Sequence, residues 1–262
     1  DPLVLKYHGH QFGHYNSELG DGRGFLLAQI LDNNNNLWDI GTKGSGQTKY
    51  SRGGDGRLTL KGAVRELLAT EFLSAIGVAT SQTLSIIETE EKLQRNDEPS
   101  PTRSAVLVRR SNSHIRIGTF QRLAYLNQQD NLEILLDYLR DNYFSYINKN
   151  SSSEIFVETV FLECVKKIAT SMGKIIISGF VHGVLNTDNF NVTGEVFDFG
   201  PWRFIQYANQ NFTAAYFDYN GRYSFGKQPE AALWALTQLG KSLNKLINEK
   251  RIIEILNEFS IN

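Results

Sequence analysis

The feature that most constrains this chain is the stretch of residues 182–200, in which a histidine, an asparagine and an Asp-Phe-Gly triplet occur in order. His182 comes first, Asn189 closes a polar Asn-Thr-Asp-Asn run, and Asp198 opens the triplet after a strand-like Val-Phe pair. The side-chain oxygens of an Asn and an Asp are suitable ligands for a hard divalent cation. The alternative is an ordinary polar turn that leads into a Thr-Gly hairpin.

The spacing of these residues matches the catalytic loop of protein kinases, in which His, Asp and Asn are followed by Asp-Phe-Gly. In kinases the Asn and the second Asp bind the metal ions that bridge the nucleotide phosphates. His182, Asn189 and Asp198 keep the kinase positions, but Val184 occupies the place of the catalytic Asp. An aspartate, Asp188, stands instead beside the Asn. Either the base has moved, or phosphoryl transfer to a hydroxyl is not the reaction.

The composition is that of an ordinary globular protein. With 262 residues, 41% of them hydrophobic, the chain can form one two-lobed domain or two small ones. A net charge of −1, from 27 basic and 28 acidic residues, gives no reason to expect nucleic acid or a membrane as a partner. The single Cys164 excludes an internal disulfide and fits a reducing compartment. Because no signal-like apolar segment follows Asp1, we expect a cytoplasmic location in a bacterium or a mitochondrial one in a eukaryote.

Glycines cluster at residues 20–24, just before the apolar, strand-like segment 25–30. Gly20 and Gly22 allow the backbone to approach a phosphate closely, and Arg23 can pair with that phosphate. A tight hairpin uses the same glycines, so both interpretations remain open. Three upstream histidines have no acidic or Cys partner close by, which favours packing over metal binding. They are His8, His10 and His14.

A second strand, residues 37–42, leads into Lys43, and a helical pattern follows over residues 58–76. In protein kinases a strand Lys contacts phosphates and is oriented by a Glu on the next helix. Glu66 lies among the apolar positions of this helix, where a carboxylate is costly unless paired, so we expect a Lys43–Glu66 ion pair. The alternative is that Glu66 lies at the solvated edge of the apolar stripe. The positions expected to face inward are Leu60, Val64, Leu67, Leu68, Phe72 and Ile76.

Residues 44–57 form a polar, glycine-rich segment that is too irregular for a helix or strand and is therefore a candidate functional loop. Its Gly-Asp-Gly-Arg at 54–57, which contains Asp55 and Gly56, repeats the tetrapeptide at 20–23. Two copies of so specific a tetrapeptide in one short region argue against chance.

Two further strands are predicted at residues 83–87 and 105–108, separated by a charged loop at 88–104. Arg109 and Arg116 follow the second strand and are candidate phosphate ligands. A solvated basic turn is the alternative for this segment.

From residue 119 onward the pattern is helical, with segments near 119–127, 131–147 and 154–173. Serines at 151–153 provide an N-terminal cap for the last of these. The predicted class is α+β, with a protein-kinase-like bilobal fold. Its strand-rich N-lobe would be residues 1–118, and its helical, truncated C-lobe residues 119–262, with the catalytic and metal-binding loop. The cleft would lie between the lobes.

The most specific motif is Phe180-Val-His-Gly-Val-Leu-Asn-Thr-Asp-Asn189, which ordinary kinases do not share. Other motifs accompany it in order over residues 7–229. They are Gly9-His-Gln-Phe-Gly13, Leu19-Gly-Asp-Gly-Arg23, Lys43-Gly44, Tyr50-Ser-Arg, Gly54-Asp-Gly-Arg57, Arg65-Glu66, Ser113-His-Ile-Arg-Ile-Gly118, Asp198-Phe-Gly-Pro201, Asp218 with Gly221-Arg-Tyr223, and Gln228-Pro229. Together they resemble the SelO (selenoprotein O, YdiU) family of protein adenylyltransferases, pseudokinase-like enzymes with a kinase-like fold.

The resemblance implies that ATP is bound turned around relative to kinases, with its γ-phosphate deep and its α-phosphate facing the acceptor. Asp188 would take the proton of the acceptor hydroxyl. Asn189 and Asp198 would ligate Mg²⁺ or Mn²⁺. Arg109 and Arg116 would hold the terminal phosphates. The full nucleotide-binding set that the resemblance implies is Gly20, Gly22, Arg23, Lys43, Asp55, Gly56, Glu66, Arg109, Arg116 and Asp198.

The implied reaction transfers AMP from ATP to Ser, Thr or Tyr hydroxyls of proteins, the protein itself included, and releases pyrophosphate. Fixed cations in a dry site would stabilise the charge that grows on the leaving pyrophosphate. The alternatives are UMP transfer by the same site, an unusual protein kinase, or a nucleotide-binding pseudoenzyme made inactive by truncation. Family members are longer and carry a redox-active Cys or selenocysteine near their end, so their thiol-based regulation is not expected in this chain.

Overall fold

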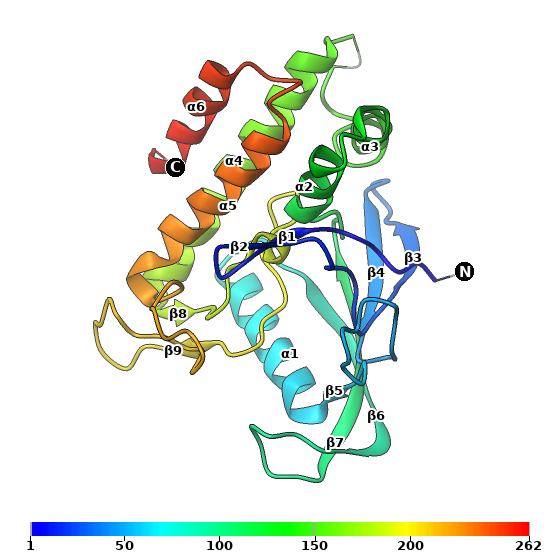
Figure 1. Cartoon of the computed structure of the whole chain (residues 1–262), viewed down its shortest axis with the longest axis vertical. Helices are drawn as coiled ribbons and strands as arrows, with labels where there is room; N and C mark the ends of the chain where they lie inside the picture. Colours follow the sequence, from blue (N-terminus) through cyan, green and yellow to red (C-terminus); the bar gives the residue numbers. More distant parts are fainter. Residues whose placement is uncertain (1, 149, 262) are drawn as a thin grey trace.

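The computed structural model describes residues 2–148 and 150–261. It is a mixed structure of β-sheet and α-helices, which confirms the predicted combination of strands and helices. Figure 1 shows the main sheet and the helix α1 in the first part of the chain, and α4, α5 and α6 packed together in the second. No helix within the described residues is both long and apolar enough to span a membrane.

The main sheet has five strands and is antiparallel throughout. Lys43 ends one central strand opposite Leu107, and Gly41 of the same strand lies opposite Arg109. Because cross-strand partners point to the same face, the Lys43 and Arg109 side chains emerge on one face of the sheet. The strands, in the order β3-β4-β7-β5 with β6 also paired to β7, are β3 (Leu26–Leu31), β4 (Leu37–Lys43), β7 (Thr102–Ser111), β5 (Leu58–Thr59) and β6 (Gln82–Leu93).

The predicted loop at residues 88–104 is wrong for most of its length, because β6 and β7 continue into it as a paired ribbon. Pairing runs out to Leu93 and Thr102, with an irregularity between Glu88 and Lys92. Arg103 and Glu88 form an ion pair on this ribbon. The charged composition reflects a ribbon that faces water, where ion pairs between neighbouring strands are tolerated.

Helix α1 (Leu60–Ala75) begins at Thr59, whose side chain accepts a hydrogen bond from the Gly62 N–H, and ends before Gly77, which has φ +76°. The predicted inward face is wrong at Val64 and Leu68, which are 40% and 54% exposed. Leu60, Phe72 and Ile76 do pack against the core, as predicted. The helix is rotated so that small residues and Glu66 meet the sheet. Its buried residues are Ala63, Glu66, Ala69, Thr70 and Leu73.

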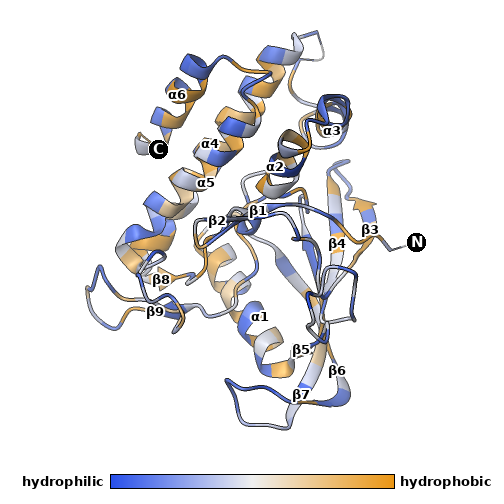
Figure 2. Ribbon diagram, in the orientation of Figure 1, coloured by the Kyte–Doolittle hydropathy of each residue, from blue (hydrophilic) through white to orange (hydrophobic). Residues whose placement is uncertain are grey.

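The three predicted helical segments are observed as Ile117–Tyr125, Gln129–Asn142 and Ser153–Ile177, so the second ends five residues before its predicted boundary. Ser152 accepts a hydrogen bond from the Ile155 N–H, which confirms the serine cap. In Figure 2 apolar and polar residues alternate along these helices, as expected for helices that are buried on one side. The helices are α2 (Ile117–Tyr125), α3 (Gln129–Asn142), α4 (Ser153–Ile177), α5 (Gln228–Ser242) and α6 (Glu249–Asn257).

The principal hydrophobic core joins α1 to the helices of the second part. Leu73 of α1 belongs to the same buried cluster as Phe161 of α4 and Leu236 of α5. A smaller cluster lies between α1 and the sheet. Shorter elements are β1 (Gly9–Gln11), β2 (His14–Asn16), β8 (Phe180–Val181), the 3₁₀ turn η1 (Thr187–Asn189) and β9 (Arg203–Phe204).

The orientation of α1 can be tested by comparing a buried leucine with an exposed one. Leu73→Ala is expected to reduce the free energy of unfolding by about 2–5 kcal/mol, because it leaves a cavity at a fully buried position. Leu68→Ala on the exposed face is the matched control and should cost less than about 0.5 kcal/mol. Urea unfolding followed by circular dichroism measures both. Equal losses for the two variants would contradict the observed orientation of the helix.

Candidate active site

A cavity of about 690 Å³ lies where the glycine-rich loops, the central strands and the segment 184–201 meet. Its volume is within the range of small-molecule sites. Every site residue predicted from the sequence lines this cavity except Glu66, which pairs with two of the lining residues from α1. The predicted residues on the wall are Gly20, Gly22, Arg23, Lys43, Asp55, Gly56, Arg109, Arg116, Asp188, Asn189 and Asp198.

The floor of the cavity is a buried ionic cluster. Lys43 is paired with Glu66 and donates to Asp198 Oδ1 at 2.8 Å. Arg109 Nη1 donates to Glu66 Oε1 at 2.8 Å and to Asp198 Oδ1 at 2.7 Å. Glu66 is only 2% exposed, so the predicted Lys43–Glu66 pair is confirmed and the solvated alternative is wrong. We call Lys43, Glu66, Arg109, Arg116 and Asp198 the ionic cluster.

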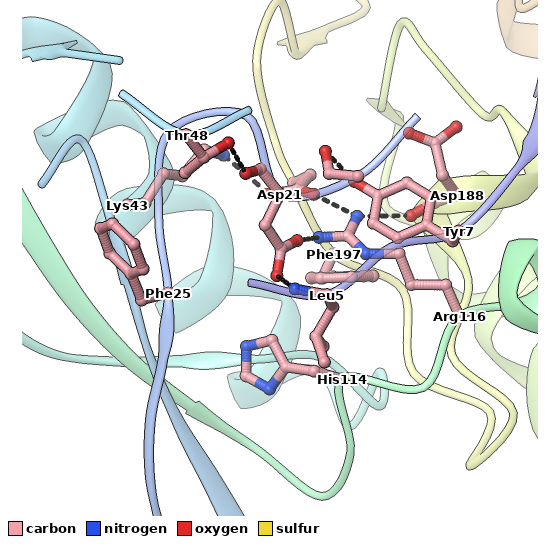
Figure 3. A network of polar contacts seen from close by, with 12 residues as sticks. Leu5, Tyr7, Asp21, Phe25, Lys43, Thr48, His114, Arg116, Asp188 and Phe197 are labelled. Carbon is pink, nitrogen blue, oxygen red and sulfur yellow. Dashed lines mark hydrogen bonds and ion pairs between the residues drawn. The ribbon is translucent and has the colours of Figure 1, made fainter. Parts of the chain in front are cut away.

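Arg116 joins the ionic cluster to both sides of the cavity. Its guanidinium donates to the Asp188 carbonyl oxygen at 2.7 Å and to Asp21 Oδ1 at 3.3 Å (Figure 3). It also donates to Asp198 Oδ2 at 2.8 Å. The rings of Tyr7 and Phe197 lie 4.6 and 4.3 Å from the guanidinium carbon. Because Arg116 is only 3% exposed, the alternative of a solvated basic turn is wrong.

The two aspartates at the cavity have opposite electrostatic environments. Burial alone would raise the pKa of Asp198, but Arg109, Lys43 and Arg116 outweigh it and hold that pKa well below its ordinary value. At Asp188 burial dominates over Arg116 and raises the carboxyl pKa to about 6. Within the part of the chain that the structure describes, Asp188 Oδ1 is buried and has no hydrogen-bond partner. Asp198 is thus fixed as an anion, while Asp188 is available to exchange a proton.

The turn that carries Asp188 is fixed by its own hydrogen bonds and by the N-terminal hairpin, which is formed by β1 and β2. Asn186 is its cap and makes a reciprocal capping box with Asn189, whose Oδ1 accepts from the Asn186 N–H at 3.1 Å. The Thr187 hydroxyl accepts from the His10 N–H at 2.8 Å. We call residues 186–189 the Asp188 turn.

The two glycine loops pack directly against each other. The Ser51 hydroxyl donates to the Gly22 carbonyl at 2.5 Å, and the Thr48 hydroxyl donates to the Asp21 carbonyl at 2.6 Å. A Cβ on Gly22 would lie 2.8 Å from the Tyr50 carbonyl oxygen, so the close contact requires glycine there. The repeated tetrapeptide therefore marks two loops that form one wall of the cavity.

The remaining predicted residues of these loops lie nearer the solvent. Arg23 is exposed at the rim of the cavity. Asp55 is exposed and paired with Arg95 at 2.8 Å. Gly56 has φ +69°, and its backbone passes close to Gly46.

Two residues at the site were missed by the sequence analysis. Asp21 pairs with Arg116, and its carboxylate and backbone also bond to Leu5. Tyr7 lies against Arg116 and donates its hydroxyl to the Gly20 carbonyl at 3.0 Å. The position of Asp21 inside the first Gly-Asp-Gly-Arg could have indicated that it belongs to the site. The residues around Tyr7 give no such indication.

The donor set fits a divalent cation that is held jointly with phosphates. No group of three or more His, Cys, Asp or Glu side chains suitable for a metal occurs in residues 2–148 and 150–261. Mg²⁺ commonly uses only one or two protein carboxylates together with phosphate oxygens and water. Asn189 and Asp198 supply oxygens of the right kind at the cavity wall. Two of the three upstream histidines are engaged elsewhere, since His8 bonds to Tyr15 and His10 to Gln121.

Comparison with known proteins identifies the family of this chain. The sequence matches the family described as "Protein adenylyltransferase SelO" over residues 1–262. Relatives called protein nucleotidyltransferase YdiU include those of Synechocystis sp. (51% identical over 98% of this chain and 54% of the relative), Trichormus variabilis (51%, 94% and 50%) and Vibrio cholerae (38%, 99% and 52%). The chain belongs to the SelO family. It spans about half the length of the curated relatives that it matches.

The ionic cluster predicts a large effect from removing one carboxylate. Glu66→Ala is expected to lower the free energy of unfolding by about 3–5 kcal/mol, because Lys43 and Arg109 lose a buried partner. Glu91→Ala is the control, since Glu91 pairs with Arg57 on the surface and should cost less than about 1 kcal/mol. Urea titration monitored by tryptophan fluorescence gives both values. A Glu66 variant as stable as the control would show that the cluster does not hold the fold together.

Proposed function

We propose that the protein is a protein adenylyltransferase, which transfers AMP from ATP to Ser, Thr or Tyr hydroxyls of protein substrates and requires Mg²⁺ or Mn²⁺. One observation carries the proposal: the buried cations of the ionic cluster share a cavity with a carboxylate oxygen of Asp188 that has no hydrogen-bond partner among the described residues. Membership of the SelO family and the name of the curated relatives support it.

The depth of the cations supports an inverted nucleotide. Lys43, Arg109 and Arg116 are each less than a tenth exposed, whereas Arg23 lies at the exposed rim. A triphosphate tail directed inward would meet the buried cations, and its α-phosphate would lie nearer the Asp188 turn. Arg109 and Arg116 would then exchange Asp198 oxygens for phosphate oxygens, since guanidinium groups bind both in the same geometry.

The proposed reaction is attack of a protein hydroxyl on the α-phosphorus of ATP. A new bond forms between the hydroxyl oxygen and the α-phosphorus, and the bond to the oxygen that bridges to the β-phosphate breaks. The hydroxyl proton passes to Asp188, whose raised pKa suits a general base. Pyrophosphate leaves with the bridging oxygen, and the buried cations stabilise its growing charge.

Asn189 and Asp198 are the residues that would hold a divalent cation. When bound, such an ion would neutralise phosphate charge and increase the electrophilicity of the phosphorus. Asn189 is already oriented by its bonds to the Asn186 N–H and the Phe197 carbonyl. Asp198 becomes available as its arginine partners turn toward the phosphates.

We propose that the chain forms a protein-kinase-like pair of lobes, with an N-lobe at residues 1–118 and a C-lobe at 119–262. The Lys43–Glu66 pair between β4 and α1 supports this comparison, as does a cavity lined from both parts of the chain. The boundary falls within α2, whose Ile117 N–H donates to the Phe190 carbonyl of the second part.

Labelled nucleotides test the reaction directly. With Mg²⁺ or Mn²⁺ present, α-³²P-ATP is expected to label a protein acceptor or the chain itself, and γ-³²P-ATP is expected to label neither. Autoradiography of denaturing gels measures the transfer, and a parallel reaction with α-³²P-UTP measures UMP transfer. Label from γ-³²P-ATP would instead indicate a kinase. Thermal stabilisation by ATP and metal without any labelling would indicate a nucleotide-binding pseudoenzyme.

The role of Asp188 is tested by Asp188→Asn. Transfer is expected to fall by about 10²–10⁴-fold, because the amide cannot accept the proton. The melting temperature should not fall, since Oδ1 has no hydrogen-bond partner to lose within residues 2–148 and 150–261 and burial disfavours the charged carboxylate. Asp137→Asn, at a side chain that is 73% exposed, is the control and should retain full transfer. Full activity in the Asp188 variant would remove it from the reaction.

A further inference from the structure

A chain of buried hydrogen bonds connects the Asp188 turn to the segment before α5. Asp218 accepts the backbone N–H groups of Arg222 at 2.9 Å and Tyr223 at 2.8 Å. The Tyr223 hydroxyl donates to Asn186 Oδ1 at 2.6 Å. Asn186 is the cap of the Asp188 turn. Tyr223 therefore links a carboxylate outside the cavity to the backbone that carries the proposed base.

The hairpin formed by β1 and β2 contacts the same residues. We call the hydrogen bonds among Phe12, Asn186 and Tyr223 the junction. The Phe12 N–H is shared between Asn186 Oδ1 at 3.1 Å and the Tyr223 hydroxyl at 3.2 Å. Phe12 has φ +51°, a conformation that is costly for a residue other than glycine and that persists where surrounding contacts impose it. A Cβ on Gly9 would come within 2.8 Å of the Thr187 hydroxyl oxygen. The contacts with the Asp188 turn therefore require a strained backbone at Phe12 and a glycine at position 9.

Asp188 itself depends on these contacts for its orientation. Its Oδ1 has no hydrogen-bond partner among the described residues, so no side-chain bond at that oxygen fixes it. Its position is set through the turn, by Arg116 at the Asp188 carbonyl, His10 at Thr187 and the junction at Asn186. Small displacements of a reacting group lower rates strongly, so the junction bears directly on transfer.

We propose that Tyr223 is a positioning residue for nucleotide transfer: its hydroxyl fixes Asn186, and through Asn186 the orientation of Asp188 toward the acceptor hydroxyl. This inference rests on the proposed function of the site. Burial raises the pKa of Tyr223 to about 12, which keeps the hydroxyl protonated as a donor. The ring also packs against Phe12 at 5.0 Å, a contact that phenylalanine would preserve. The hydroxyl can therefore be removed without emptying the core.

The test compares Tyr223→Phe with Tyr219→Phe, a control in the same segment whose side chain is 88% exposed. For Tyr223→Phe, kcat for AMP transfer is expected to fall by about 10- to 100-fold while the KM for ATP is unchanged, because the ionic cluster is intact. Amide hydrogen exchange followed by mass spectrometry should be faster for residues 182–197 and unchanged in α5. The Tyr219 variant should match the wild type in both measurements.

The outcomes are distinct. A kcat equal to that of the Tyr219 control would overturn the inference, and so would a loss of ATP affinity with faster exchange throughout the chain, which would mean general damage to the fold. If the wild-type chain shows no transfer, the proposed function fails. The exchange measurement then decides separately whether Tyr223 restrains the turn: unchanged exchange at residues 182–197 in Tyr223→Phe would overturn that claim too.

Discussion

The structure depends on the burial of three cationic side chains against two carboxylates. Lys43 comes from β4, Arg109 from β7 and Glu66 from α1, while Arg116 and Asp198 come from segments on either side of the cavity. An ion taken out of water without a partner costs several kcal/mol. If one of these segments moved, the charged side chains of the others would lose their partners. The ion pairs therefore couple the positions of the sheet, α1 and the Asp-Phe-Gly segment.

The same constraint explains why α1 leaves Val64 and Leu68 exposed. Turning Leu68 inward would gain at most about 1.5–3 kcal/mol. Turning Glu66 away from Lys43 and Arg109 would cost about 3–5 kcal/mol, because the cations would lose a buried partner. The loss of ion pairing is the larger of the two, so the helix buries Glu66 together with Ala63 and Ala69. The apolar periodicity of the helix alone cannot predict that Glu66 is buried, because it takes account of hydrophobicity but not of ion-pair partners.

What the sequence could predict follows from how local each signal is. The Lys43–Glu66 pair was accessible because a carboxylate within an apolar stripe needs a partner, and the Asp188 turn because its residues lie close together in sequence. The contact between Asp21 and Arg116 spans 95 positions and that between Tyr223 and Asn186 spans 37. The residues next to one partner do not indicate which distant residue it contacts. The paired ribbon of β6 and β7 was missed for a related reason, because charged residues on a solvated strand resemble a loop.

The charge balance of the cavity supplies a physical reason for the proposed metal requirement. Lys43, Arg109 and Arg116 are already paired with Glu66, Asp198 and Asp21, so the buried floor of the cavity offers a triphosphate no surplus of positive charge. Moving the arginines onto phosphate oxygens would leave Asp198 without its partners in a buried position, which is itself unfavourable. A divalent cation beside Asp198 would compensate both the carboxylate and the phosphates at once. Nucleotide and metal binding are therefore expected to be coupled through Asp198.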